Sequence, residues 1–539
     1  MKWRDWASAD RRLQPICFVI LVVALGALAV RVPRLRMRPM HTDEAVHADK
    51  FRLLLENDRY EYDPREYHGP TLNYLTLIPT WLSSAREYAQ IDEITVRIVP
   101  VAFGVILVLL TVLIADGLGW AAVVAALLAA LSPAMTFYSR YYIQEMLLVC
   151  FTFGAIACGY RYTRAGSLPW ALAAGAFIGL MHATKETAVI AFGAMAVALV
   201  VSARGRPSRA RPIHLVLGLA TALIVSALFY SSFFSHPRGV LDSYLTYATY
   251  LGRAGGAASV HVHPWHYYLQ ILVFSRYQGG PIWTEGGIVL LAIVGAAAAV
   301  KPSRGGPVDA RLVRFLAVYT AAMVVVYSAI PYKTPWCLLS FLHGMILLAG
   351  VGAVTLLVWM RRPAGRALAA VALIAVMGHL AVQTYLANFV YYADSRNPYV
   401  YAHPTPEIFT AVETVREFAG PQRPYPTPIQ VMVPDRDYWP LPWYLRDLRV
   451  GYYCEVPPAQ EIGPLVLISD KLERILARRL YEEIPPQRRQ MYMYLFKEPY
   501  YVWFRPGVKL MGFVRRDLWE QHDRQMADLP ELPEGARGE

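Results

Sequence analysis

The sequence predicts an all-α polytopic membrane protein of about eleven transmembrane helices, followed by a small C-terminal α/β soluble domain. Three observations lead to this prediction. Hydrophobic residues make up 56% of the 539 residues, and the mean hydropathy of +0.31 is higher than a soluble core of this size requires. Apolar runs of about twenty residues recur along the chain. After Tyr391 the pattern changes to short apolar strands and amphipathic helices.

The first apolar run, Leu13–Val30, follows several basic residues and contains the A-x-A-like sequence Ala27-Leu-Ala29, so a cleaved signal peptide is one interpretation. Because the run is long and many others follow, we expect an uncleaved first helix. The remaining spans are expected at Ile94–Ala115, Ala121–Phe137, Met146–Tyr160, Leu168–Met181, Thr187–Val201, Ile213–Phe234, Ile288–Val300, Leu312–Ile330, Pro335–Met360 and Leu368–Val390.

Two segments do not have the length of a single span. The stretch Leu168–Val201 would extend about 50 Å as one helix, longer than a bilayer core of about 30 Å. Polar residues at His182–Glu186 interrupt it, which predicts two short helices that meet at a membrane surface. Leu72–Ser84 is apolar on one side and too short to span, so we expect a helix that lies in the membrane interface and roofs the site.

Basic loops set the expected orientation. The positive-inside rule assigns to the cytoplasm the clusters Arg161/Arg164, Arg204/Arg206/Arg209/Arg211, Lys301/Arg304/Arg311/Arg314 and Arg361/Arg362/Arg366. The N-terminus is then cytoplasmic in a multi-pass protein of the cytoplasmic membrane. The outer face receives residues 31–93, 138–145, 182–186, 235–287, 330–334 and everything after 391. Against the rule, this face also receives Arg31, Arg34, Arg36 and Arg38, which anionic lipid headgroups or phosphate could neutralise.

The net charge of +12 is a topology signal rather than a sign of nucleic-acid binding, because the basic residues gather in short loops between apolar segments. The chain has five cysteines and no CxxC pair, and four of the five lie in or beside apolar runs. We therefore expect neither a disulfide framework nor a zinc site.

We divide the chain into a transmembrane domain, 1–391, with a first outer loop at 31–93, an outer α/β domain, 392–526, and a disordered, acidic and Pro-rich tail, 527–539. In the α/β domain, Ile429–Val433 and Leu465–Ile468 predict buried strands. Pro406–Phe418 and Lys471–Leu480 predict amphipathic helices. The domain is either a structural lid or a surface that recognises the acceptor.

The densest group of titratable side chains is His41-Thr-Asp43-Glu44-Ala-Val-His47, just beyond the first span. The other polar motifs fall on the same outer face, which predicts one active surface rather than several unrelated patches. Asp43 and Glu44 have a second interpretation, because acidic residues in a first turn also stabilise a helix, here Ala45–Leu55.

The motifs on this face resemble those of GT-C fold glycosyltransferases. The resemblance covers residues 1 to about 400, and it is strongest to the branch with protein O-mannosyltransferases and lipid A aminoarabinose transferases. Within that branch the chain is most similar to prokaryotic flippase-associated proteins of archaeal N-glycosylation. The motifs that carry the resemblance are DEAVHA (Asp43–Ala48), YDPxxYHGP (Tyr62–Pro70), Arg-Tyr-x-x-Gln-Glu (Arg140–Glu145), TKET (Thr184–Thr187), Pro-Trp-x-Tyr-Tyr (Pro264–Tyr268), PYKTPW (Pro331–Trp336) and, more loosely, DYWPLPWYLR (Asp437–Arg446).

The resemblance implies an inverting transfer of a monosaccharide from a polyprenyl-phosphate donor to an acceptor hydroxyl outside the cytoplasmic membrane. In such a displacement the attacking oxygen loses a proton, so a carboxylate must lie within hydrogen-bond reach. Asp43 matches the family's base position. We expect Asp43 to be the catalytic base and Glu44 to orient it or the acceptor.

The leaving group is a lipid phosphate, which departs more easily when cations neutralise its charge. The candidates on the outer face are Lys185, Lys333, Arg140 and Arg276. Lys185 and Lys333 each interrupt two spans, and prolines bracket Lys333. The alternative for each is that the side chain only reaches for the interface, with Glu186 as an ion-pair partner of Lys185.

The sugar and the acceptor are expected to contact His68, Glu145, Tyr141, His263, Trp265 and Tyr332. Histidines are frequent on this face, and a divalent metal is the alternative to hydrogen bonds with sugar hydroxyls. Because no spacing is specific for ligands, we expect no metal cofactor. Aromatic side chains at these helix ends also suit an ordinary interfacial belt, and Glu145 has a second interpretation as the partner of Arg140.

Two other classes of function are consistent with a polytopic chain. A lipid flippase would share the architecture, but the sequence has neither an inverted repeat nor an ionisable residue deep in a span. A non-catalytic partner in lipid-linked glycan assembly would keep the fold, and the presence of Asp43 favours an enzyme. The donor sugar and the acceptor, whether protein, lipid-linked glycan or polymer, cannot be read from the sequence.

Overall fold

The computed structural model describes residues 13–65, 68–202, 210–254, 261–300, 308–419, 427–458 and 461–527. The chain divides into two compact units. The first comprises Met1–Arg36 and Lys50–Tyr401, and the second comprises Met37–Asp49 and Ala402–Glu539. The expected tail, 527–539, lies outside the described residues except for Ala527.

The boundary between the units falls ten residues after the expected one at 391, because residues before Ala402 still bond to the helical unit. Asn397 Nδ2 donates to the carbonyl of Ala387 at 3.1 Å, and the Tyr399 hydroxyl donates to Glu285 at 2.8 Å. The sequence did not indicate that a short piece of the first outer loop, Met37–Asp49, would group with the C-terminal residues.

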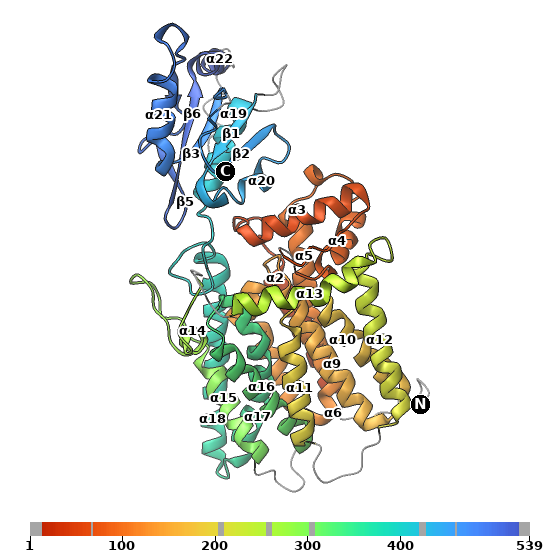
Figure 1. Ribbon diagram of the computed structural model, residues 1–539. Coiled ribbons are helices and arrows are strands. Elements are labelled where there is room, and N and C mark those ends of the chain that lie inside the picture. Colours follow the sequence, from red (N-terminus) through yellow and green to blue (C-terminus); the bar gives the residue numbers. More distant parts are fainter. Residues whose placement is uncertain are drawn as a thin grey trace. The chain divides into compact units, whose positions relative to one another are not determined.

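The helical unit contains the expected apolar helices (Figure 1). Within the described residues, seven helical runs are long and apolar enough to cross a membrane, and four shorter apolar helices accompany them. The eleven are α2 (Leu13–Arg31), α5 (Glu93–Leu110), α7 (Trp120–Leu131), α9 (Glu145–Ala165), α10 (Leu168–His182), α11 (Ala188–Ser202), α12 (Pro212–Tyr230), α15 (Gly286–Val300), α16 (Ala310–Ala329), α17 (Leu339–Trp359) and α18 (Pro363–Tyr385). Each expected span overlaps one of them, and the break at His182–Glu186 is confirmed.

The structure divides the expected span Ala121–Phe137 into two helices. The span forms α7 and a separate short helix, α8 (Pro133–Tyr138), because Ser132 takes an extended conformation before Pro133 and caps α8 with its hydroxyl. Burial separates central from peripheral helices. In α9 and the run that contains α17, 83% and 72% of the apolar window is buried, against 22% in α2 and 17% in the run that contains α18.

Small residues allow α15 and α17 to pack backbone against backbone. A Cβ added to Gly295 would lie 2.0 Å from the carbonyl oxygen of Leu348, and one added to Gly352 would lie 1.9 Å from that of Leu291. Such close approach of two helices requires glycine at the contact, as in other membrane helix pairs.

We expect Gly352→Ala to destabilise the protein by about 1–3 kcal/mol, because the added methyl group forces α15 away from α17. The matched control is Gly378→Ala in α18, where an added Cβ meets no atom within 4 Å. Thermal unfolding in detergent, followed by the elution of the folded protein from a gel-filtration column, measures the difference. Equal stability of the two variants would contradict the packing argument.

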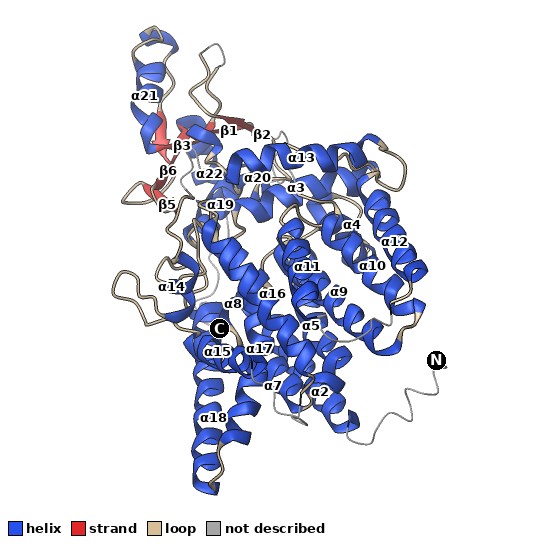
Figure 2. Ribbon diagram, turned by 60° about the horizontal axis from the view of Figure 1, so that its bottom comes forward, coloured by secondary structure: helices blue, strands red, loops and turns tan. Residues whose placement is uncertain are grey.

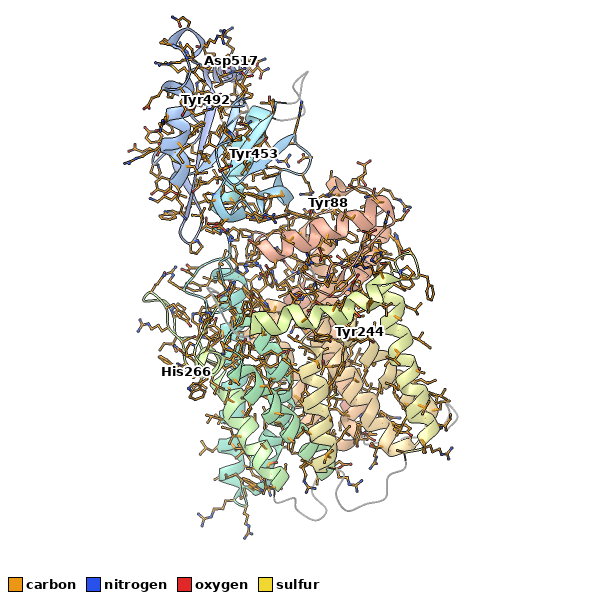
Figure 3. All side chains as sticks on the ribbon, viewed as in Figure 1. Tyr88, Tyr244, His266, Tyr453, Tyr492 and Asp517 are labelled. Carbon is orange, nitrogen blue, oxygen red and sulfur yellow. The ribbon has the colours of Figure 1, made fainter. Side chains whose placement is uncertain are left out.

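Two further helices, α4 (Thr71–Leu82) and α13 (Arg238–Ala254), are amphipathic in the reverse sense to a helix of a soluble protein. In α4, Thr76 and Thr80 are buried while Trp81 and Leu82 are exposed. In α13, Asp242 and Thr246 are buried, and the exposed residues include Leu241, Tyr244 and Leu245. Figure 3 labels Tyr244 on this helix. Polar faces turned inward and apolar faces turned outward suit helices whose outer side meets lipid.

The second unit is built on one sheet, and Figure 2 labels five of its strands, β1, β2, β3, β5 and β6. The strands are β1 (Ile429–Met432), β2 (Val450–Tyr453), β3 (Leu465–Ser469), β4 (Tyr492–Tyr494), β5 (Tyr501–Arg505) and β6 (Val508–Arg515). Their order is β2-β1-β3-β6-β4, with β5 also paired to β6. The β1 strand runs parallel to β2 and β3, whereas β6 is antiparallel to β3, β4 and β5.

The expected strands correspond to β1 and β3, which are completely buried and form the centre of this sheet. The helices of the unit are α19 (Glu407–Ala419), α20 (Leu441–Tyr444), α21 (Glu473–Tyr481) and α22 (Arg516–Ala527). Two of these, α19 and α21, were expected. Strands β2 and β4 are short, partly exposed and rich in Tyr, so they lack the apolar signal of the central pair.

Candidate functional site

The start of helix α3 (Thr42–Asn57) presents Asp43. His41 precedes the helix, and its main-chain N–H donates to Glu44 Oε2 at 3.0 Å, while its Nδ1 accepts the Asp43 N–H at 3.0 Å. This arrangement is a capping box in which His41 takes the capping position and Glu44 the third residue of the helix. Glu44 is completely buried, with Arg38 Nη2 at 3.9 Å. Glu44 therefore stabilises the helix start, and its role in orienting Asp43 or the acceptor stays a prediction.

The Asp43 carboxylate has a different environment. Its side chain is 43% exposed, and its Oδ2 lies 3.9 Å from His41 Nδ1. That nitrogen accepts the Asp43 N–H, and at 3.9 Å it is too far from Oδ2 for a hydrogen bond with the carboxylate. Among the described residues, nothing engages this carboxylate in a hydrogen bond, so the helix-capping interpretation applies to Glu44 and not to Asp43.

In the helical unit, Glu145 and Lys185 form a buried ion pair. Lys185 Nζ donates to Glu145 Oε1, and the side chains are 8% and 3% exposed for the lysine and the glutamate. Glu145 is the first residue of α9, and Lys185 lies in the turn between α10 and α11. Glu145 thus pairs with Lys185 rather than with Arg140, and the charge of Lys185 also lowers the pKa of the Glu186 carboxyl.

Glu186 pairs with His68. His68 Nδ1 lies 2.7 Å from Glu186 Oε2, and the Tyr62 hydroxyl donates to Oε1 at 3.3 Å. Beside this pair, the Thr71 and Thr184 hydroxyls lie 2.8 Å apart. The YDPxxYHGP and TKET motifs, which lie far apart in the sequence, therefore meet through His68 and Glu186.

Burial acts to raise the pKa of the Glu186 carboxyl, but the charge of His68 and its hydrogen bond outweigh burial and hold the pKa below its ordinary value. A carboxyl whose folded pKa is depressed stabilises the protein above its unfolded pKa, and this contribution is lost as pH falls through the folded pKa.

We therefore expect the melting temperature of the wild type to exceed that of Glu186→Gln at neutral pH. The difference should shrink as pH falls below about 4.3, the ordinary value for glutamate. Thermal unfolding of the two proteins across this range measures it, and Glu482→Gln, at an exposed position, is the control. A difference that stays constant down to the lowest pH would contradict the pairing.

Lys333 lies in the turn between α16 and α17, as expected from its flanking prolines. Its Nζ donates to the carbonyls of Ile330 and, at 3.2 Å, His263, and burial lowers the pKa of its ammonium group. The Tyr401 hydroxyl lies 2.7 Å from His261 Nδ1 and 3.3 Å from His263 Nε2. The segments 261–268 and 331–336 are thus joined to the end of the helical unit.

The two candidate arginines differ in their availability. Arg140 Nη2 donates to the carbonyls of Pro33 and Arg34 at 2.8 and 3.3 Å, so it fastens the chain that follows α2. Arg276 is exposed, and its Nε donates to the Gly280 carbonyl at 3.0 Å. Its two Nη groups have no partner among the described residues. Arg31 is completely buried and donates to the carbonyls of Ala129 and Ala130, so it needs no lipid headgroup.

Comparison with known proteins extends this picture. Residues 70–230 match the family described as dolichyl-phosphate-mannose-protein mannosyltransferase. The structure is similar to two crystal structures of ArnT from Cupriavidus metallidurans, one bound to undecaprenyl phosphate and one in the apo state. The TM-scores are 0.58 and 0.59 at 15% identity, and each match covers 91% of this chain and 97% of ArnT. The chain has the GT-C fold. No curated protein sequence matches it.

The family match covers less than half of the chain, and the likeness to ArnT at 15% identity shows the fold. The matched segment runs from α4 to α12 of the GT-C chain and includes Glu145, Lys185 and Glu186. It does not include Asp43 or Lys333, whose roles depend on the arguments from residues and geometry.

The aromatic candidates of the GT-C chain fall into two groups. Trp265 is 65% exposed and Tyr332 is 37% exposed, so their rings are accessible for stacking on a sugar. Tyr141 is completely buried, with its ring 5.8 Å from that of Trp336. This position corrects the sugar-stacking role expected for Tyr141, because its ring is packed into the protein. A group of three or more metal-ligating side chains is not found among the described residues.

Sequence reasoning missed Glu285, a completely buried carboxylate of the GT-C unit. It accepts hydrogen bonds from the Ser132 hydroxyl at 2.5 Å, the Ala134 N–H at 3.0 Å and the Tyr399 hydroxyl at 2.8 Å. Glu285 therefore joins the start of α8 and the start of α15 to the chain that leaves the unit. The available signal was a lone glutamate directly before the apolar stretch of α15.

Proposed function

We propose that this protein is an inverting glycosyltransferase that moves a monosaccharide from a polyprenyl-phosphate donor to an acceptor hydroxyl at the outer face of the membrane. The exposed Asp43 carboxylate, uncommitted to other described residues at the start of α3, carries the proposal. The GT-C fold supports it, because one ArnT structure is bound to undecaprenyl phosphate. The basic loops support a cytoplasmic N-terminus and an outer active site.

In the proposed reaction the acceptor oxygen attacks the anomeric carbon of the donor sugar. The bond from that carbon to the phosphate oxygen breaks, and the polyprenyl phosphate leaves with the bonding electrons. Asp43 accepts the proton of the acceptor hydroxyl. One displacement inverts the anomeric configuration, so no covalent sugar–enzyme intermediate forms.

We assign direct contact with the donor phosphate to Arg276, because its exposed guanidinium keeps donors that no described residue uses. The other three candidate cations already donate hydrogen bonds to protein oxygens; they are Lys185, Lys333 and Arg140. They would therefore stabilise the phosphate by their charge rather than by donating all of their hydrogen bonds to it. Trp265 and Tyr332 offer exposed rings to the sugar, and His68, His263 and Glu145 complete the proposed polar contacts.

The test is sugar transfer by the purified full-length protein in liposomes. The vesicles carry one radiolabelled polyprenyl-phosphate sugar at a time, such as mannose, glucose or aminoarabinose, and either a peptide or a lipid-linked glycan as acceptor. Transfer to one acceptor, with the product in the inverted configuration, is the expected result. Movement of the donor across the bilayer without any transfer would overturn the proposal and favour a flippase.

A further inference from the structure

The segment that carries Asp43 is built into the C-terminal unit. Residues Met37–Asp49 group with the chain from Ala402 onward, not with the helices on either side of them in the sequence. Two contacts of the residues just before Asp43 join this segment to the unit. The Met40 N–H donates to the Tyr444 hydroxyl at 2.8 Å in a buried position, and the rings of His41 and His403 pack with centroids 4.8 Å apart.

A third contact involves Arg505, the last residue of β5. Its Nη1 donates to the hydroxyl of Thr42 at 3.1 Å, and its Nη2 donates to Asp437 Oδ1. The side chain of Arg505 is 12% exposed. A planar guanidinium that donates from two nitrogens fixes both acceptors in direction as well as distance. Because Thr42 is the residue before Asp43, this fork fixes the first turn of α3.

The groups that make these contacts are themselves held in place. Tyr444 is 8% exposed, and its carbonyl accepts a hydrogen bond from Arg416 Nη2 at 2.7 Å. Asp437 follows Asp435 and Arg436, whose φ angles of 58° and 61° lie in the left-handed region that residues other than glycine rarely adopt. Backbone strain of this kind persists only where the surrounding structure requires it.

We propose that Arg505 is a positioning residue for the base, with Tyr444 in the same role, and that the C-terminal unit serves to hold Asp43 in its reactive orientation. This inference rests on the proposed function. The three residues before Asp43 each have a partner from the C-terminal unit, whereas the Asp43 carboxylate itself is exposed. The base is therefore supported through its backbone, and its oxygens stay available for an acceptor.

The first test compares rates. Arg505→Lys keeps the charge but loses the fork, and we expect kcat to fall by about 10- to 100-fold while the KM for the donor is unchanged. Tyr444→Phe removes one hydroxyl and should lower kcat in the same way. Thr42→Val should lower kcat, whereas Thr42→Ser, which keeps the acceptor oxygen, should restore it. The matched control is Arg515→Lys.

Arg515 is a suitable control because it pairs with a carboxylate in the same unit. Its Nε donates to Asp517 Oδ1 at 2.7 Å, and Figure 3 labels Asp517 in this unit. Arg515 belongs to β6 and pairs with the residue two positions ahead of it rather than with the segment 37–49. If Arg515→Lys lowered kcat as Arg505→Lys does, the loss would reflect the stability of the unit alone. That result would overturn the inference.

The second test does not depend on activity. Hydrogen exchange of the peptide that covers residues 40–47 should be faster in Arg505→Lys than in the wild type, and unchanged in Arg515→Lys. If Arg505→Lys kept the wild-type kcat while Asp43→Asn was inactive, only this inference would be overturned. Wild-type transfer by Asp43→Asn would instead overturn the base on which the proposed function depends.

Discussion

Asp43→Asn is expected to lower kcat by about 10²- to 10⁴-fold, which is the usual contribution of a positioned general base. The amide is isosteric with the carboxylate but cannot accept the proton of the acceptor hydroxyl. Stability should change little, because the Asp43 side chain is 43% exposed and makes no hydrogen bond with the described residues. The measurement is single-turnover sugar transfer at matched amounts of folded protein.

The contrast with Glu44→Gln makes this prediction sharper. Glu44 is buried with Arg38 Nη2 at 3.9 Å, and glutamine keeps the oxygen that accepts the His41 N–H but loses the charge that faces this arginine, so the substitution should lower stability by about 1–3 kcal/mol. We expect Glu44→Gln to shift the unfolding temperature and Asp43→Asn to change the rate. The reverse pattern would show that the two carboxylates have exchanged roles.

Lys185→Met is expected to cost about 3–5 kcal/mol of stability, because it leaves the buried Glu145 carboxylate without a counter-charge. The double variant Glu145→Gln/Lys185→Met removes both charges and should recover most of that loss. Unfolding in detergent, carried through the full double-mutant cycle, measures the coupling between the two side chains.

The control for this cycle is the exposed pair Arg516 and Glu520 on α22, whose loss should cost at most about 1 kcal/mol. If Lys185→Met were as stable as the wild type, the ion pair would not be structural. Lys185 would then be available for the donor phosphate, and the roles assigned to Lys185 and Arg276 would have to be exchanged.

The sequence was a good guide to the helices. Spans in a membrane need long apolar runs, and each predicted run overlaps an apolar helix of the structure. The break at His182–Glu186 was predictable because polar residues divide a run that is too long for one span. The division at Ser132–Pro133 was signalled by the proline, but the run around it is apolar, so hydropathy alone concealed it.

The sequence was a weaker guide to partners. The alternative interpretation of Lys185 paired it with Glu186, its neighbour in the chain, yet Lys185 pairs with Glu145, and Glu186 pairs with His68. Neighbours in a turn point in different directions, and only the packing of α9 against the following helices decides which carboxylate each cation meets. Patterns along the chain also carry no information about Arg505 and Thr42, which are separated by 463 positions.

That separation has a consequence for the order in which the protein is made. Thr42 and Asp43 leave the ribosome early, but the arginine that holds them is synthesised 463 residues later. At about 5–20 residues per second, the interval is on the order of 20 to 90 seconds. During this time the proposed base has no support from the C-terminal unit. If Asp43 is the base, a nascent or truncated chain would carry its membrane helices without a competent base, and the synthesis of the last strands would mark the onset of activity.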